Sequence, residues 1–225
     1  GDLMNWEVNI NKGSLPYENT FKLFNKRLKK NSTFIDVGAQ YGSITLQASS
    51  VLSDLGGGKI ICVEANPIVY ECLNLNLKNI KEDYIALNKA ATNQSTSLVR
   101  FPIPDIEAIQ KIHHRGYGSF GIAINEKHPR KSSCWSLEPL KLDDLLTQIL
   151  EPVSVIKIDV EGHELSVLEG AINIIKEFKP ALVLEHNYQA EKPFKEVESL
   201  LNELNYQHFG INRRGDVLAL DKGQT

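Results

Sequence analysis

The sequence FIDVGAQYGS, residues 34–43, decides the fold class. A short apolar run ends here in Gly38-x-x-x-Gly42, and a helical pattern follows at once. Glycine has no Cβ, so a ligand can come close to the backbone of such a loop. A strand, a glycine loop and a helix in this order predict the first unit of an open α/β sheet. Ligands of such sheets bind at the carboxyl ends of the strands.

The spacing of this loop differs from the G-x-G-x-x-G of dinucleotide enzymes, because Gln40 stands where the second glycine would be. That second glycine admits a pyrophosphate, which S-adenosylmethionine does not have. The loop therefore favours a sulfonium cofactor over NAD. A tight strand-to-helix turn without any ligand is the alternative for the loop taken alone.

Short β-like runs alternate with helical patterns along the rest of the chain. The expected strands are Thr33–Val37, Lys59–Glu64, Tyr84–Asn88, Val153–Asp159 and Ala181–Glu185. The expected helices are Tyr17–Leu28 within a leading segment 1–32, then Gly42–Leu55, Pro67–Leu77, Leu140–Leu150, Glu164–Phe178 with a break at Gly170, and Phe194–Leu204. A hairpin at 205–220 follows. This alternation predicts a doubly wound, mostly parallel α/β sheet with right-handed crossovers, in a single domain 1–225.

The segment 103–139 does not fit the alternation. It contains Gly116, Gly118 and Gly121 together with several prolines, and it has no sustained periodicity. A stretch of this length inside a compact domain is usually functional or disordered. We expect it to be an irregular insertion that caps the site and faces the substrate.

The overall composition indicates a globular protein and excludes some partners. Hydrophobic residues make up 42% of the chain and charged residues 24%, with a net charge of −3, so no general affinity for nucleic acid or anionic membranes is expected. No run approaches the ~20 apolar residues of a membrane span, and the N-terminus does not resemble a signal peptide. The three cysteines have neither disulfide nor metal spacing, which favours a cytoplasmic location.

An acidic residue ends the second predicted strand, KIICVE. Glu64 is followed by Asn66-Pro67, a typical helix start. A carboxylate at this place can accept hydrogen bonds from both ribose hydroxyls of a nucleoside. The alternative is a surface glutamate that the positive end of the next helix stabilises.

Ionisable residues gather after the fourth and fifth strands. Asp159, Glu161 and His163 follow the run VSVIKI, and Glu185 and His186 follow ALVL. Groups that converge on one crevice from separate strands are typical of a site that handles protons or stabilises charge. His163 could instead be an ordinary hydrogen-bonding residue at a helix start.

Five blocks in order, FIDVGAQYGSIT, CVEANPIVYECLNLN, ALNKAA, IKIDVEGHELSVLEGA and ALVLE, resemble the FkbM family of methyltransferases. The resemblance implies a class I, Rossmann-like methyltransferase fold whose seven-stranded sheet has an antiparallel last strand. It also implies O-methylation of a hydroxyl on a sugar or secondary metabolite with S-adenosylmethionine. The implied cofactor residues are Asp36, Gly38, Ala39, Gln40, Tyr41, Gly42, Glu64, Ala65, Asn66, Asn88, Ala90 and Asp159.

A hydroxyl acceptor has to lose its proton, and a base close to it contributes ~10²–10⁴-fold. The candidates are Asp159, Glu161, His163, Glu185 and His186. In a variant of this mechanism, Asp159, Glu185 and His186 hold Mg²⁺, which acidifies the hydroxyl. No ligand spacing in the sequence demands a metal.

Three other functions compete with this hypothesis. An NAD-dependent oxidoreductase or epimerase needs a dinucleotide fingerprint, which the loop after the first strand does not have. A binding module that has lost activity would not need Asp36, Gly38, Glu64 and Asp159 all intact. An RNA 2′-hydroxyl methyltransferase would use the basic residues of segment 103–139, but acidic residues dilute them. We therefore expect a small-molecule or saccharide acceptor.

Overall fold

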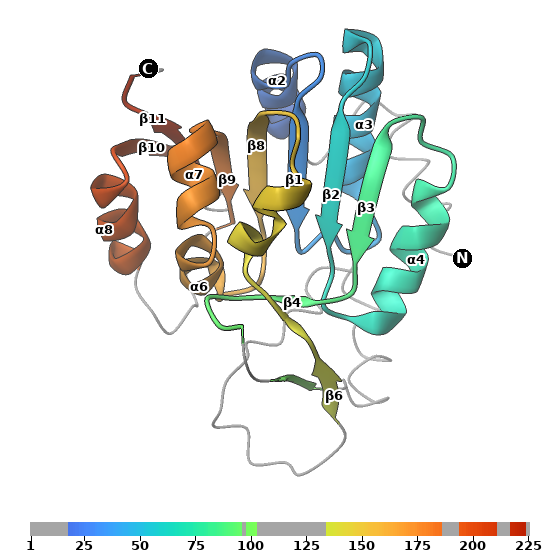
Figure 1. The fold of residues 1–225 in the computed structure, drawn as a ribbon. Coiled ribbons are helices and arrows are strands. Elements are labelled where there is room, and N and C mark those ends of the chain that lie inside the picture. The colour runs from blue at the N-terminus through green and yellow to red at the C-terminus, as the bar shows by residue number, and fades with distance from the viewer. Residues whose placement is uncertain (1–17, 96–97, 103–133, 186–193, 211–216, 224–225) are drawn as a thin grey trace.

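A computed structural model describes residues 18–95, 98–102, 134–185, 194–210 and 217–223. The strands of its main sheet are β1 (Thr33–Val37), β2 (Lys59–Val63), β3 (Asp83–Leu87), β8 (Val153–Ile158), β9 (Ala181–Leu184), β10 (Tyr206–Gly210) and β11 (Val217–Asp221). They lie in the order β10-β11-β9-β8-β1-β2-β3 (Figure 1). Strand β11 is antiparallel to both of its neighbours, whereas β9, β8, β1, β2 and β3 are parallel. The predicted doubly wound, mostly parallel sheet is confirmed.

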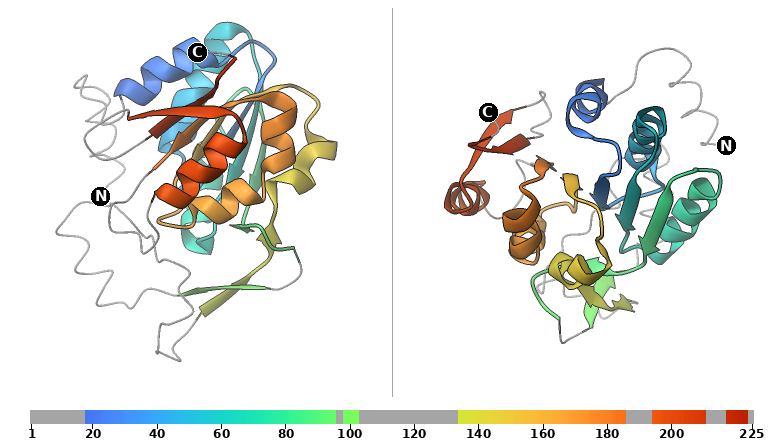
Figure 2. Two further views of the ribbon diagram at one scale, coloured as in Figure 1. Left: turned by 90° about the vertical axis from the view of Figure 1, so that its left-hand side faces the viewer. Right: turned by 45° about the horizontal axis from the view of Figure 1, so that its top comes forward.

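Helices cover both faces of this sheet (Figure 2). One face packs against α2 (Glu18–Arg27), α3 (Ser43–Leu55) and α4 (Pro67–Leu77), and the other against η1 (Leu142–Gln148), α6 (Glu164–Glu169), α7 (Ile172–Phe178) and α8 (Lys195–Glu203). Neighbouring residues of one strand enter opposite layers: Phe34 belongs to the core under α3, and Ile35 to the core under α7. Both side chains are fully buried. Burial of each such side chain stabilises the fold by about 1.5–3 kcal/mol.

The two helices that begin beside the site, α3 and α4, start at residues that the local sequence predicts. Helix α3 begins after Gly42, whose φ of 93° is left-handed, and it ends at the left-handed Gly56. Helix α4 begins as predicted, because the Asn66 side chain accepts hydrogen bonds from the backbone N–H groups of Ile68 and Val69, and Pro67 follows it. Both helices thus begin at the sheet's carboxyl edge, directly after β1 and β2.

The chain reverses its winding direction next to β1. It passes from β1 to β2 and β3, and then returns so that β8 pairs with the other side of β1. The carboxyl ends of β1 and β8 therefore form the topological switch point, where open α/β sheets bind ligands. Gly38 follows β1 there, and Asp159 follows β8.

The structure differs from the sequence prediction in two places. Residues 140–150 were expected to form an α-helix, but they contain the 3₁₀-helix η1. Leu142 and Leu145 are buried on one side of it, and residues three apart eclipse one another in a 3₁₀-helix. The insertion 103–139 was expected to be irregular throughout, but its last residues form strands: β6 (Cys134–Leu137) pairs with β5 (Val99–Pro102), and β7 (Pro139–Leu140) pairs with β4 (Ala90–Ala91).

The remaining predicted elements are close to their expected places. Helix α2 lies within 17–28, the helical pattern 164–178 is interrupted at Gly170 between α6 and α7, and β10 and β11 pair as an antiparallel hairpin. Strands β4 and β6 lie beyond the carboxyl ends of the main sheet, at the bottom of Figure 1. Residues 103–133 of the insertion lie outside the described part. None of the helices in the described ranges has the length and apolar character to cross a membrane.

Candidate cofactor and reaction site

The loop after β1 alternates left-handed and ordinary backbone. Gly38, Gln40 and Gly42 have φ values of 73°, 54° and 93°. At Gly38 a Cβ would lie 1.8 Å from the backbone oxygen of Asp159, so only glycine fits. The loop and the end of β8 are therefore in direct backbone contact at the switch point.

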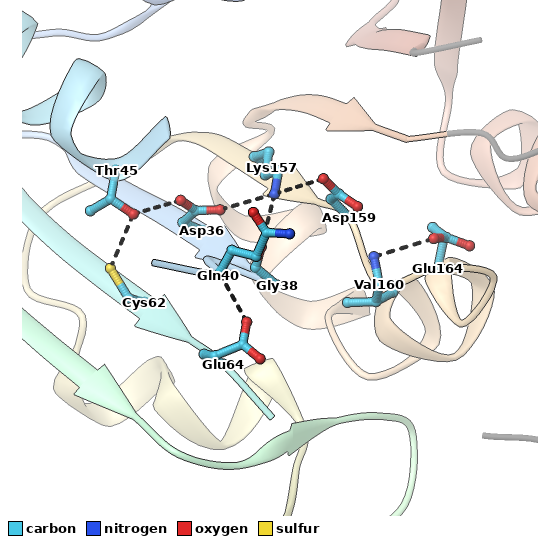
Figure 3. Close-up of polar contacts among 10 residues, drawn as sticks. All are labelled: Asp36, Gly38, Gln40, Thr45, Cys62, Glu64, Lys157, Asp159, Val160 and Glu164. Carbon is cyan, nitrogen blue, oxygen red and sulfur yellow. Dashed lines mark hydrogen bonds and ion pairs between the residues drawn. The ribbon is translucent and has the colours of Figure 1, made fainter. Parts of the chain in front are cut away.

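Glu64 binds the same loop from β2. Its Oε2 accepts the backbone N–H of Gln40 at 2.8 Å (Figure 3). Its Oε1 accepts the backbone N–H of Asn66, also at 2.8 Å. The left-handed backbone of Gln40 thus directs its N–H toward the Glu64 carboxylate. This hydrogen bond joins the loop to Glu64. Burial raises the pKa of Glu64, and the hydrogen bonds from Asn66 and Gln40 oppose this rise.

An ionised carboxylate offers about four acceptor positions, of which the two backbone groups use two. The remaining two suit a pair of adjacent ribose hydroxyls. Glu64 is only 8% exposed, so such hydrogen bonds would form largely away from water. The residues present therefore fit the nucleoside of S-adenosylmethionine.

Asn88 was predicted as a cofactor residue, and its amide supports Glu64. The Nδ2 atom donates to the backbone oxygens of Glu64 and Ala65, at 2.8 and 3.1 Å. Ala90 is buried in a small apolar cluster with Leu137, against which Ala65, Val99 and Trp135 pack. Ala65, which follows β2, and Ala90, the first residue of β4, thus share one apolar patch. Such a patch is the kind of surface that an adenine ring requires.

The other predicted loop residues lie close by. Tyr41 is half-buried, and its backbone oxygen accepts the Asn76 amide at 2.6 Å. Burial raises the pKa of the Tyr41 hydroxyl. Ala39 is buried in the layer under α3. Asp36 is fully buried, and its Oδ2 accepts the Thr45 hydroxyl at 2.6 Å, so its carboxylate ties the first turn of α3 to β1.

Three predicted acidic residues meet on the reaction side. Asp159 follows β8, Glu185 follows β9, and one carboxylate oxygen from each lies within 4.8 Å of one from Glu161. Glu161 has a left-handed φ of 54°, and Gly162 follows it with 99°, so the chain turns sharply here. Three converging carboxylates can bind hydroxyl groups, accept a proton or hold a divalent cation.

The two histidines do not both join this group. The His163 Nε2 atom lies 3.3 Å from the Thr92 hydroxyl, beside β4, and His163 is not one of the three grouped residues. His186, which was predicted both as a base and as a Mg²⁺ ligand, lies outside the described residues.

The charge of Asp159 is stabilised by its neighbours. Burial disfavours the ionised form, but the Lys157 ammonium and hydrogen bonds from Glu185 and Lys157 outweigh this effect and lower the pKa of Asp159. The Lys157 Nζ lies 3.2 Å from Asp159 Oδ2. A hydrogen bond between the carboxyl groups of Asp159 and Glu185 requires a proton on one of them.

Sequence reasoning missed two residues that build the site. Lys157 is the fifth residue of the apolar run VSVIKI. A charged side chain in a strand that is covered on both faces needs a partner. This was the signal in the sequence that could have identified it. Glu164 was named only as the first residue of the expected helix Glu164–Phe178. Its Oε1 accepts the backbone N–H groups of Gly162 and Val160, at 2.9 and 3.3 Å, and thereby shapes the turn after Asp159. Burial raises the pKa of Glu164, and these hydrogen bonds oppose it.

Comparison with known proteins shows the family and fold to which this chain is similar. The Methyltransferase FkbM domain matches residues 36–208. The crystal structure of Methyltransferase FkbM from Methylobacillus flagellatus KT is 20% identical with a TM-score of 0.55, and the match covers 86% of this chain and 44% of that one. This chain thus spans less than half the length of that protein. A Streptococcus mutans protein solved with SAH is 14% identical with a TM-score of 0.50, covering 91% of this chain and 96% of its own.

No curated protein matches the chain. The two solved structures share its fold at low sequence identity, and the FkbM domain covers most of its length, from the cofactor loop to β10. The chain belongs to the FkbM methyltransferase family and has the class I methyltransferase fold.

Proposed function

We propose that this enzyme methylates a hydroxyl group of a sugar or another small metabolite. The observation that carries the proposal is the group of Asp159, Glu161 and Glu185. One carboxylate oxygen of each lies within 4.8 Å of one from each of the others, and Asp159 contacts Gly38 of the cofactor loop. When bound, S-adenosylmethionine supplies an electrophilic methyl group. The chain itself has to align the acceptor oxygen in line with that methyl group and receive the hydroxyl proton.

Asp159 is the residue that we assign to the acceptor hydroxyl. Its backbone contacts the Gly38 loop directly, and Lys157 keeps its carboxylate ionised. An ionised carboxylate can only accept hydrogen bonds, so it orients a hydroxyl with the oxygen lone pairs free for reaction. Asp159 then receives the proton as the new bond forms.

The number of carboxylates favours a polyhydroxy acceptor. A single hydroxyl needs one hydrogen-bond acceptor, whereas Glu161 and Glu185 supply further acceptors within the same small space. Neighbouring hydroxyls of a sugar ring would occupy these acceptors in a fixed orientation.

A divalent cation offers a second way to activate the same hydroxyl. Two adjacent carboxyl groups need either a shared proton or a cation between them, and oxygen-rich sites suit Mg²⁺. The ligands would be Asp159, Glu161 and Glu185. This alternative predicts that turnover depends on added Mg²⁺ and is lost in EDTA, whereas the proton mechanism predicts turnover in EDTA.

The test is an acceptor screen with monosaccharides, glycosides and a short RNA, followed by assays of Asp159→Asn. We expect methylation of a saccharide, a fall in turnover of ~10²–10⁴-fold in Asp159→Asn, and an affinity for S-adenosylhomocysteine within about threefold of wild type. Asp221→Asn is the control, because Asp221 is also buried and paired with a lysine, Lys179, but lies on β11 away from the site. Methylation of RNA alone, or full turnover in Asp159→Asn, would contradict the proposal.

A further inference from the structure

A chain of polar side chains crosses the carboxyl end of the sheet beneath the cofactor loop. The Cys62 thiol lies 3.6 Å from the Thr45 hydroxyl, which donates to Asp36 at 2.6 Å. The other Asp36 oxygen faces Lys157 Nζ at 3.4 Å, and Lys157 reaches Asp159 at 3.2 Å (Figure 3). The chain therefore connects β2, α3, β1 and β8 in one layer. It ends at the residue that we assign to the acceptor.

Lys157 is the centre of this chain. Its side chain is only 10% exposed, and a buried ammonium is unfavourable unless oxygens surround it. Its three N–H donors face three oxygens: the backbone oxygen of Gly38 at 3.0 Å, Asp159 Oδ2 at 3.2 Å and Asp36 Oδ1 at 3.4 Å. Asp36 Oδ1 has no hydrogen bond among the described residues. Among those residues, the Lys157 ammonium therefore offsets the cost of burying the Asp36 charge.

These three oxygens belong to parts of the site with different tasks. Gly38 begins the cofactor loop, Asp159 lies on the acceptor side, and Asp36 is the fully buried end of β1. The loop and the end of β8 also touch through their backbones, since a Cβ on Gly38 would lie 1.8 Å from the Asp159 oxygen. A movement of Lys157 must therefore shift both the loop and the Asp159 carboxylate.

We propose that Lys157 is a positioning residue that couples the cofactor loop to the acceptor-side carboxylate. Its ammonium holds the Gly38 carbonyl and the Asp159 carboxylate in one arrangement, so that a bound cofactor and an acceptor hydroxyl meet in line. The part of this proposal that concerns the acceptor rests on the proposed function. The part that concerns the cofactor loop does not.

The test compares Lys157→Met with Lys59→Met, the matched control. Lys59 has similar side-chain exposure, 12%, and also faces a carboxylate, Asp83 at 3.5 Å, and a backbone oxygen, that of Gln148 at 3.4 Å, but it lies at the other end of the sheet. We expect S-adenosylhomocysteine to bind about tenfold more weakly to Lys157→Met, and within about twofold of wild type to Lys59→Met. Equal losses in the two variants, after correction for the folded fraction, would overturn the proposal.

Two further measurements separate positioning from mere support of the fold. Loss of the ammonium leaves excess negative charge beside the site, so the positively charged S-adenosylmethionine should lose less affinity than neutral S-adenosylhomocysteine, whereas a general loss of structure weakens both alike. In turnover, the double variant Lys157→Met/Asp159→Asn should be no slower than Asp159→Asn alone, because both changes break the same unit. The proposal would be overturned if Lys157→Met lost equal affinity for both ligands. It would also be overturned if the double variant were slower than Asp159→Asn by the factor that Lys157→Met alone causes.

If Lys157→Met does not fold, a second variant that keeps hydrogen-bond donors at this position can replace it in the test. Lys157→Gln can still donate to the Gly38 and Asp159 oxygens but carries no charge. It should show the same change in the affinity ratio of the two ligands, with a smaller loss of overall affinity. Binding of both ligands does not require an acceptor. If no saccharide is methylated, the proposed function fails while the binding measurements still decide the role of Lys157.

Discussion

Glu64 is the residue on which cofactor affinity should depend most directly. Glu64→Ala removes a carboxylate that has two acceptor positions left for the ribose, so S-adenosylhomocysteine binding should weaken by about 1.5–3 kcal/mol. Isothermal titration measures this change. Glu82→Gln is the control, since Glu82 is equally buried, at 8%, but accepts the Ser49 hydroxyl far from the loop. Unchanged affinity in Glu64→Ala would return Glu64 to a structural role.

The same residue predicts how binding responds to pH. Burial raises the pKa of Glu64 above its ordinary 4.5, and the ribose hydroxyls hydrogen-bond to its ionised form. Affinity for S-adenosylhomocysteine should therefore be constant near neutral pH and fall as the pH drops through the raised pKa, before reaching 4.5. Titrations between pH 7 and pH 5 test this. Glu64→Gln should bind S-adenosylhomocysteine more weakly, and its affinity should no longer depend on pH in this range. If the affinity of Glu64→Gln fell at low pH just as that of wild type does, the pH dependence would belong to another group.

At the scale of elements, a deletion at the ribbon of β5 and β6 can test whether cofactor binding and acceptor binding depend on different segments. The two strands are antiparallel with Pro102 opposite Cys134, so an Asn-Gly turn can join them directly. Replacing residues 103–133 by this turn keeps the apolar patch of Ala90 and Leu137. We expect S-adenosylhomocysteine affinity to be retained and saccharide methylation to be lost. Retained methylation would show that the replaced segment does not hold the acceptor.

For the whole molecule, a ligand that binds only the folded state stabilises it by mass action. At a concentration 100 times its Kd, S-adenosylhomocysteine should add about 2.7 kcal/mol to the free energy of unfolding. For a domain of this size, that raises Tm by roughly 5–11 °C. NAD should leave Tm unchanged, because Gln40 occupies the place of the glycine that admits a pyrophosphate. Stabilisation by NAD alone would contradict the assignment of the cofactor loop.

Much of this molecule could be predicted from local sequence. Periodicity and capping residues predicted the strands β1, β2, β3, β8 and β9 and the start of α4 at Asn66-Pro67, because these signals act between residues close in the chain. The order of glycines and acidic strand ends also predicted which edge of the sheet carries the site. The 3₁₀-helix η1 and the strands at 134–140 were missed, because they depend on burial and pairing with distant segments.

The sequence by itself determined the fold class, the carboxyl edge and the acidic residues that gather there. Only the tertiary structure decided how these residues are connected. Lys157 and Asp36 are 121 residues apart, and their pairing depends on β8 returning to the far side of β1. The same return brings the Asp159 backbone against Gly38 and directs His163 to Thr92. Such contacts arise from strand order, which has no local signal along the chain.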